Sequence, residues 1–165
     1  MDHRIDTLLQ VLDQAFDRAA WHGTNLRGSI RGLSLNEALW RPHVGRHNIW
    51  EIVLHTAYWK FCVRRHLAGD RSLKFARPGS DWPAMPSPRD EKAWKRDVAL
   101  LGSEHKSLRR ELSSFPPTRL TARPPKLKWR YEQYIYGAAS HDLYHAGQIQ
   151  LIKRLVRVAG ARART

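Results

Sequence analysis

A chain of 165 residues is long enough for one domain with its own core and too short for two typical domains. Its hydrophobic content of 42% and its seven tryptophans exclude intrinsic disorder. The net charge of +14 would attract nucleic acid, but the 29 lysines and arginines are spread along the chain, which favours a solvated basic surface over a nucleic-acid footprint.

The first predicted helix covers residues 3–30, where apolar side chains recur at helical spacing. Two glycines weaken its second half. A short helix is expected next, because Ser34 and Glu37 have the spacing of a capping box and Pro42 ends the stretch.

A second long helix is predicted to begin after Asn48, since Asn48 and Glu51 repeat the N-capping pattern. Its apolar run continues to Gly69, a residue suited to the left-handed conformation at a helix C-terminus. The following residues 70–86 contain several prolines and have no periodicity, so we expect a long irregular connection there.

Two more long helices complete the predicted order. Ser87 and Pro88 suit an N-cap and a first helical position, and the helical spacing after them continues to about Ser114. Residues 115–129 hold four prolines and predict a second irregular connection. The last helix is expected over residues 131–158.

These elements, without any strand pattern, predict an all-α fold: a four-helix bundle with a long crossover connection between helices two and three. We expect residues 1–165 to form a single domain, with residues 158–165 as a basic C-terminal tail. No segment has the length and apolarity of a membrane span or of a signal peptide, so neither membrane insertion nor secretion is predicted.

Three histidines lie on the apolar stripes of the second and fourth long helices. His141 and His145 are one turn apart on a stripe that is otherwise apolar. His55 lies on the second helix in a stripe with Ile52, Trp59 and Cys62. In a bundle, side chains in such positions face inward, so all three histidines are expected in the core.

Two interpretations of these histidines are open from the spacing alone. Each can be a core histidine that is hydrogen-bonded to the backbone or to a carboxylate. Alternatively, a divalent cation binds the nitrogens of His141 and His145 together, and His55 on the facing helix completes an open site of three protein ligands. A single cysteine, Cys62, cannot form an internal disulfide or a thiolate cluster, which predicts a cytoplasmic protein with nitrogen and oxygen metal ligands.

The segments HNIWEIVLHTAYWKF (47–61) and HDLYHAGQIQLIKRL (141–155) resemble the second and fourth helices of the DinB-like (DinB/YfiT-like) metalloenzymes. The helix order and the long connection agree with that family along nearly the whole chain. The resemblance implies a four-helix bundle in which three histidines hold a divalent metal, commonly zinc or nickel. The matching positions are His55, His141 and His145, and all three are present.

Family members with known activity are mostly transferases or isomerases that use a low-molecular-weight thiol, so the resemblance implies a small-molecule substrate and such a thiol as a cofactor. It also implies a homodimer. Exposed aromatic residues such as Trp82 or Trp129 would support dimer formation, and packing within the subunit is an equal alternative for them.

The residues near the histidines have competing interpretations as well. Cys62 is interpreted as a core residue rather than a nucleophile. Glu51 suits either the capping box or a role beside the metal. Asp142 and Gln148 flank the ligands and can orient an imidazole, although Asp142 lies off the inward stripe and is expected to pair with a neighbouring helix.

Three functions are consistent with this sequence. The first is a metal-dependent enzyme, a thiol-dependent transferase or a hydrolase, with unassigned catalytic residues. The second is a non-catalytic metal-binding stress-response module, which a fourth protein ligand would indicate. The third is a nucleic-acid binder, the weakest hypothesis, because the sequence has no recognition-helix motif and no clustered basic stripe.

Overall fold

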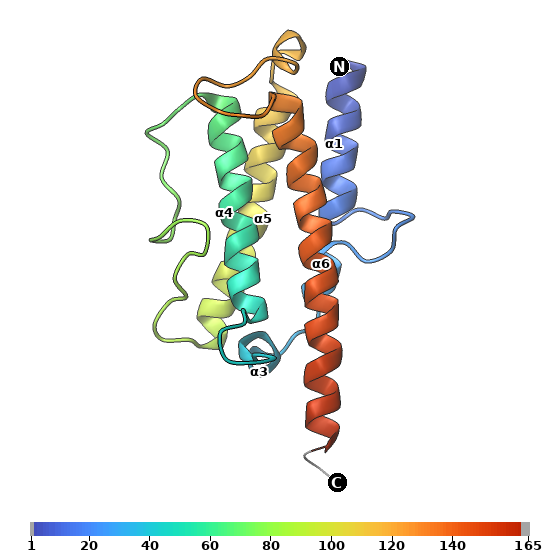
Figure 1. The fold of residues 1–165 in the computed structure, drawn as a ribbon, viewed down its shortest axis with the longest axis vertical. Coiled ribbons are helices and arrows are strands. Elements are labelled where there is room, and N and C mark those ends of the chain that lie inside the picture. Colours follow the sequence, from blue (N-terminus) through green and yellow to red (C-terminus); the bar gives the residue numbers. More distant parts are fainter. Residues whose placement is uncertain (1, 163–165) are drawn as a thin grey trace.

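The computed structural model describes residues 2–162 of the chain, and it is helical throughout (Figure 1). Among these residues there are six α-helices, one short 3-10 helix and no strand, so the predicted all-α class is confirmed. None of these helices combines the length and the apolarity that a membrane span requires. In chain order the elements are α1 (His3–Phe16), α2 (Leu26–Ile30), α3 (Leu35–Leu39), α4 (Ile49–Ala68), α5 (Glu91–Ser113), η1 (Pro117–Arg119) and α6 (Tyr131–Arg162).

The prediction of one continuous helix over residues 3–30 is wrong. Helix α1 ends at Phe16, and α2 begins only at Leu26. Between them Gly23 adopts a φ of +96°, which a continuing helix cannot contain. The side chain of Asn25 then accepts a hydrogen bond from the backbone N–H of Gly28 at 2.8 Å and starts α2. The N-cap at Asn25 therefore starts a new helix, although the apolar periodicity continues through the segment.

The helix-capping predictions for α3 and α4 are confirmed. Ser34 and Glu37 form a reciprocal capping box at the start of α3, and Asn48 and Glu51 form another at the start of α4. Gly69 ends α4 with a φ of 69°, the left-handed conformation expected there. Because α4 begins at a defined residue, the position of every side chain along it is defined as well.

Two predicted boundaries differ from the structure. Helix α5 begins at Glu91 rather than directly after Ser87, because the carboxylate of Asp90 accepts the N–H of Ala93 at 2.7 Å and caps the helix. Helix α6 continues past the predicted end at residue 158 to Arg162. The basic tail thus begins within α6, and its residues 163–165 lie outside the described part of the chain.

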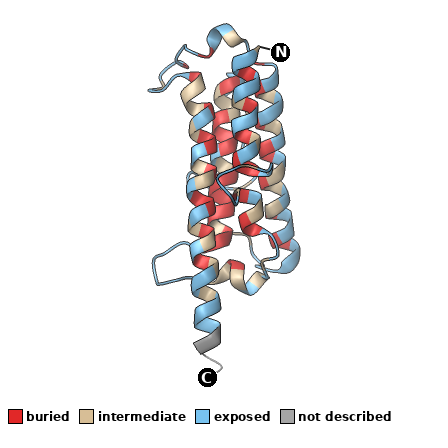
Figure 2. Cartoon of the chain, turned by 90° about the vertical axis from the view of Figure 1, so that its right-hand side faces the viewer, coloured by how far each residue is buried: buried red, intermediate tan, exposed pale blue. Residues whose placement is uncertain are grey.

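The four long helices contact one another in a ring: α4 packs on α5 and α6, and α1 packs on α5 and α6. Helices α4 and α5 run in the same direction, so the connection between them returns along the whole length of the helices (Figure 1). Buried residues follow the axis of this ring, whereas residues 154–160 of α6 extend beyond the other helices and are mostly exposed (Figure 2). The long connection thus lies along the outer side of α4, where it can contact side chains that α4 presents.

The core has an apolar cluster at each end and polar residues between them. On α4, one cluster contains Trp50 and Ala57 and the other contains Val63 and Leu67. On α6, the clusters likewise lie before and after the histidine segment. The buried polar residues of the intervening layer include His55, Lys60, His105, Asp142 and His145. A polar layer inside a helical core needs internal partners for its charges and hydrogen-bonding groups.

Candidate metal centre

The three histidines of the two apolar stripes meet in the polar layer. Their candidate ligand atoms all lie within 4.8 Å of one another, and within the described residues they are the one such group of three. The Nε2 atom of His141 is 3.1 Å from Nε2 of His55 and 3.1 Å from Nε2 of His145. Metal–nitrogen bonds of about 2.0–2.1 Å place two tetrahedral ligands about 3.3 Å apart. The spacing therefore suits a single divalent ion.

Two helices bring these side chains together. His141 and His145 are one turn apart on α6, and His55 projects from α4, which packs directly against α6. His55 and His145 are buried, and His141 is half-buried. The inward orientation predicted for the pair is thus complete for His145 and partial for His141. The α4 stripe predicted that Trp59 faces the core, but this residue is 37% exposed.

Hydrogen bonds on the other ring nitrogen orient two of the imidazoles. Nδ1 of His55 donates to the backbone carbonyl oxygen of Asp81 at 2.7 Å. Nδ1 of His145 donates to the side-chain oxygen of Gln148 at 2.7 Å. Metal-binding histidines commonly have this arrangement, in which one nitrogen donates to an oxygen and the other binds the ion. The predicted orienting role of Gln148 thus has a contact that supports it.

The protein alone cannot satisfy all the nitrogens of this cluster. Because His55 and His145 carry their hydrogens on Nδ1, the Nε2 atom of each can only accept. The Nε2 atom of His141 faces both, and its one hydrogen can be donated to only one of them. At least one buried lone pair is left without a donor, whereas a cation at the centre engages all three. The donor set therefore fits a metal ion.

Burial also keeps the imidazoles in the neutral form that metal binding requires. Loss of solvation, reinforced by the neighbouring histidines, lowers the pKa of His141 to about 3. Burial lowers the pKa of His145 to about 4 despite the opposing hydrogen bond to Gln148. Burial lowers the pKa of His55 too. At neutral pH none of the three needs to lose a proton before it binds a cation.

Residues of the connection between α4 and α5 complete the surroundings of His55. Asp81 has a positive φ of 59°, and its carboxylate accepts the indole N–H of Trp59 at 2.8 Å. The indole of Trp82 stacks on His55 with the ring centres 3.9 Å apart and on His47 at 3.5 Å. Trp82 is half-buried, and its stacking contacts support the alternative of packing within the subunit for this residue. Sequence reasoning missed the role of Asp81, since an irregular stretch has no periodicity that predicts its contacts.

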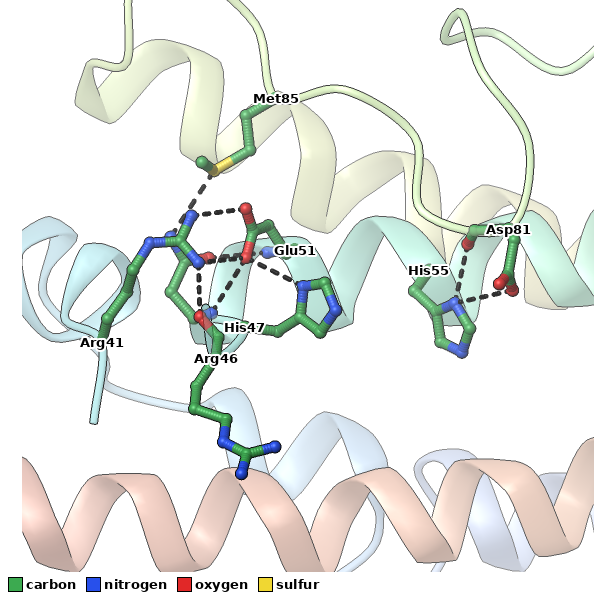
Figure 3. A network of polar contacts seen from close by, with 8 residues as sticks. Arg41, Arg46, His47, Glu51, His55, Asp81 and Met85 are labelled. Carbon is green, nitrogen blue, oxygen red and sulfur yellow. Dashed lines mark hydrogen bonds and ion pairs between the residues drawn. The ribbon is translucent and has the colours of Figure 1, made fainter. Parts of the chain in front are cut away.

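Glu51 has the capping role rather than a place beside the metal. Its carboxylate accepts the backbone N–H of Asn48 at 3.0 Å, the guanidinium of Arg41 at 2.8 Å and Nδ1 of His47 at 3.2 Å (Figure 3). Figure 3 also shows that His55, which lies further along α4, points toward Asp81 and away from this network. The carboxylate of Glu51 thus anchors the start of α4 and the segment before it.

The remaining candidates occupy the core or the surface. Cys62 is buried, and burial raises the pKa of its thiol, in agreement with the core interpretation. Asp142 forms the predicted ion pair with a neighbouring helix, and its partner is Lys60 of α4. Lys60 itself is buried, which the interpretation of the lysines and arginines as a solvated surface did not predict. Tyr144 is exposed beside His145, with the ring centres 5.1 Å apart.

A cavity of about 660 Å³ gives access to the three histidines, which all form part of its wall. One side of this access cavity is polar, with His43, Arg46 and His47. An apolar part of the wall is formed by residues of α6, namely Leu151, Ile152 and Leu155. The cluster is therefore reachable by a small molecule.

Comparison with known proteins agrees with this geometry. The family model that matches the chain is described as the DinB superfamily, and it covers residues 5–149. The matched residues run from α1 into α6 and include all three histidines. No curated protein and no solved structure shows a significant match to the chain.

Proposed function

The chain belongs to the DinB superfamily, and we propose that it is a divalent-metal-dependent enzyme. His55, His141 and His145 are the proposed ligands. The observation that carries the proposal is the convergence of three neutral Nε2 atoms on one point while two of the opposite nitrogens are already engaged.

Zinc or nickel is the proposed metal, because three imidazoles suit both ions and leave coordination positions for other ligands. A metal in this site would lower the pKa of a bound water or thiol. Asp81 holds the imidazole of His55 in one tautomer, and Gln148 does the same for His145. Stacking of Trp82 on His55 keeps water from one face of that ring.

We propose a small anionic substrate and a low-molecular-weight thiol as the second reactant. The guanidinium of Arg46 in the wall of the access cavity can pair with a carboxylate or phosphate group. The one thiol of the chain, on Cys62, is buried and has a raised pKa, so a reactive thiol has to come from a bound molecule. Transfer or isomerisation with such a thiol is the proposed reaction class.

The alternative function is a non-catalytic metal-binding stress-response module. A purely structural metal site is normally closed by a fourth protein ligand. Within residues 2–162 the cluster contains three histidines and no further histidine, cysteine or carboxylate, and the access cavity reaches it. These two observations favour the enzyme.

We further propose that α1, α4, α5 and α6 are the four-helix bundle of this family, with the connection between α4 and α5 as its crossover. The ring of contacts among these helices supports this proposal. We also propose that residues 1–165 form a single domain and that the protein is cytoplasmic. We also propose a homodimer, because the exposed part of α6 carries Leu151, Leu155 and Val158 at helical spacing. Since Leu151 and Leu155 also line the access cavity, the second subunit would lie beside its mouth. Sedimentation velocity tests the oligomeric state directly.

Elemental analysis of the untagged protein tests the metal site. About one zinc or nickel per chain is expected in the wild-type protein, and His145→Ala should lose it. His3→Ala is the matched control, because His3 is exposed at the start of α1 and should leave the metal content unchanged. A wild-type protein that holds no stoichiometric metal after exposure to zinc and nickel would overturn the proposal.

A further inference from the structure

A second cavity of about 370 Å³ lies between α4 and α6 on the other side of His141. It shares only this histidine with the access cavity described above. We propose that this second cavity binds a small uncharged molecule with an aromatic ring, which donates a hydrogen bond to Asp142. The proposal needs no bound metal, although the proposed ligand His141 forms part of the cavity wall, because the contacts that it uses are those of Asp142 and a set of aromatic rings.

The polar end of the second cavity contains a hydrogen-bond acceptor without a donor. Asp142 is fully buried at 0% exposure and contributes to the cavity wall. Its Oδ2 atom accepts from the ammonium group of Lys60. Its Oδ1 atom is buried and has no hydrogen-bond partner among the residues that the structure describes. An O–H or N–H group of a ligand stabilises a buried carboxylate oxygen in this state once the side chain, which is 0% exposed, turns toward the cavity.

The charges around Asp142 favour a neutral ligand. Lys60 is 1% exposed and already pairs with the carboxylate, so the two residues together carry no net charge. A cation in the cavity would lie near the buried ammonium, and an anion would lie near the buried carboxylate. Either would also lose its own hydration. A hydroxyl group or a ring N–H makes the hydrogen bond without these costs.

Aromatic rings make up much of the rest of the wall, beside Val63, Gln133, Gly137 and Ala138. Trp59, Trp129, Tyr134 and Tyr136 line the second cavity. The exposed fractions of Trp129 and Tyr136 are 46% and 45%, so large rings stand open to solvent beside it. Aromatic side chains around a concave surface with one buried polar group are typical of small-molecule sites. Ring stacking therefore supplies the contact area, and Asp142 supplies the orientation.

Gly137 provides a variant that fills the second cavity without touching its polar end. It lies within α6 and contributes to the cavity wall. A Cβ atom added there meets nothing within 4 Å, so a side chain is tolerated and projects into free space. Gly147 is the matched control, since it is an exposed glycine of the same helix whose added Cβ also meets nothing within 4 Å. Leucine at either position also removes a helix-weakening glycine.

The test is isothermal titration calorimetry with two probes that differ in one hydrogen-bond donor, 2-naphthol and its methyl ether. The wild-type chain should bind 2-naphthol saturably and the ether at least about tenfold more weakly. Gly137→Leu should abolish binding of 2-naphthol, and Gly147→Leu should bind it as the wild type does. Equal affinity for the two probes, absence of binding by 2-naphthol, or unchanged binding by Gly137→Leu would each overturn the proposal.

The same titration of the His145→Ala chain separates this inference from the metal function. His145 does not line the second cavity, so loss of a metal ligand should leave the affinity for 2-naphthol unchanged. Failure of the metal analysis with retained probe binding would overturn the metal function alone. Loss of probe binding in His145→Ala would overturn the independence of the second cavity from the metal centre.

Discussion

The backbone carbonyl oxygen of Asp81 lies 2.7 Å from Nδ1 of His55 and determines which nitrogen of that imidazole faces the cluster. The two residues are far apart in the sequence, and Asp81 reaches His55 because the connection between α4 and α5 returns along α4 (Figure 1). Asp81 holds this carbonyl in place with a φ of 59°. A local backbone conformation thus supports the geometry of the candidate metal centre.

Asp81→Val should weaken metal binding. A β-branched residue resists the positive φ of this position, so the carbonyl is expected to move away from His55. Loss of such an outer contact lowers metal affinity by about 10–100-fold. Competition with a chromophoric chelator measures the affinity. Asp81→Gly, which keeps the backbone conformation, should stay much closer to the wild type, and an equal loss in both variants would contradict the role given to the carbonyl.

Gln148 offers a parallel test on α6. Gln148→Leu removes the acceptor of the His145 Nδ1 hydrogen, and metal affinity should again fall by about 10–100-fold. Gln148→Glu retains an acceptor and makes the imidazole more basic, so it should bind metal at least as tightly as the wild type. The chelator competition distinguishes the two variants. Similar affinity of Gln148→Leu and the wild type would show that His145 needs no partner.

The ion pair between Lys60 and Asp142 should be costly to break on one side only. Lys60→Met leaves the carboxylate of Asp142 buried without its partner and should lower the free energy of unfolding by about 3–5 kcal/mol. In the double variant with Asp142→Leu, most of this loss should be recovered, since apolar replacements of a buried pair are often neutral or stabilising. Urea denaturation of the two variants measures the difference. An additive loss in the double variant would contradict this account.

His105 should make stability depend on pH. Burial, with smaller contributions from the charges of Lys60, Arg109 and Arg27, lowers the pKa of this imidazole from 6.5 to about 3. Asp13 lies 3.4 Å from Nε2 of His105 and favours the charged form, but its carboxylate is also engaged by Arg109. The folded protein therefore binds no proton at His105 until the pH is near the lower value, whereas the unfolded chain binds one near 6.5.

The sign of the effect follows from this difference in proton binding. As the pH falls from 6.5 toward about 3, the free energy of unfolding should fall by at most about 1.4 kcal/mol per pH unit through His105. His105→Gln removes the titrating group, so its stability should decline less steeply over the same range. Urea unfolding at a series of pH values measures both slopes. Equal slopes would show that His105 is already charged in the folded protein.

Features that depend only on neighbouring residues were predictable from the amino-acid sequence. Helix ends are such features: Ser34 and Asn48 cap helices, and Gly69 ends one in the left-handed conformation. Each interacts with residues only a few positions away, so its role was predictable from the local sequence. The spacing that places His141 and His145 on one face is likewise a property of a single helix. Local hydrogen bonds and helical periodicity require no knowledge of the rest of the molecule, so a pattern in the sequence is sufficient for them.

The groups that contact the histidines from distant parts of the chain could not be predicted before the helices were seen packed together. The contacts of Asp81 and Trp82 with His55 depend on the path of an irregular connection that has no periodicity. The burial of Lys60 depends on Asp142, which lies on another helix. A lysine is rarely buried in a core unless its ammonium group is paired with a carboxylate. These contacts join segments far apart in the chain. They can stabilise the protein only after the helices have packed together.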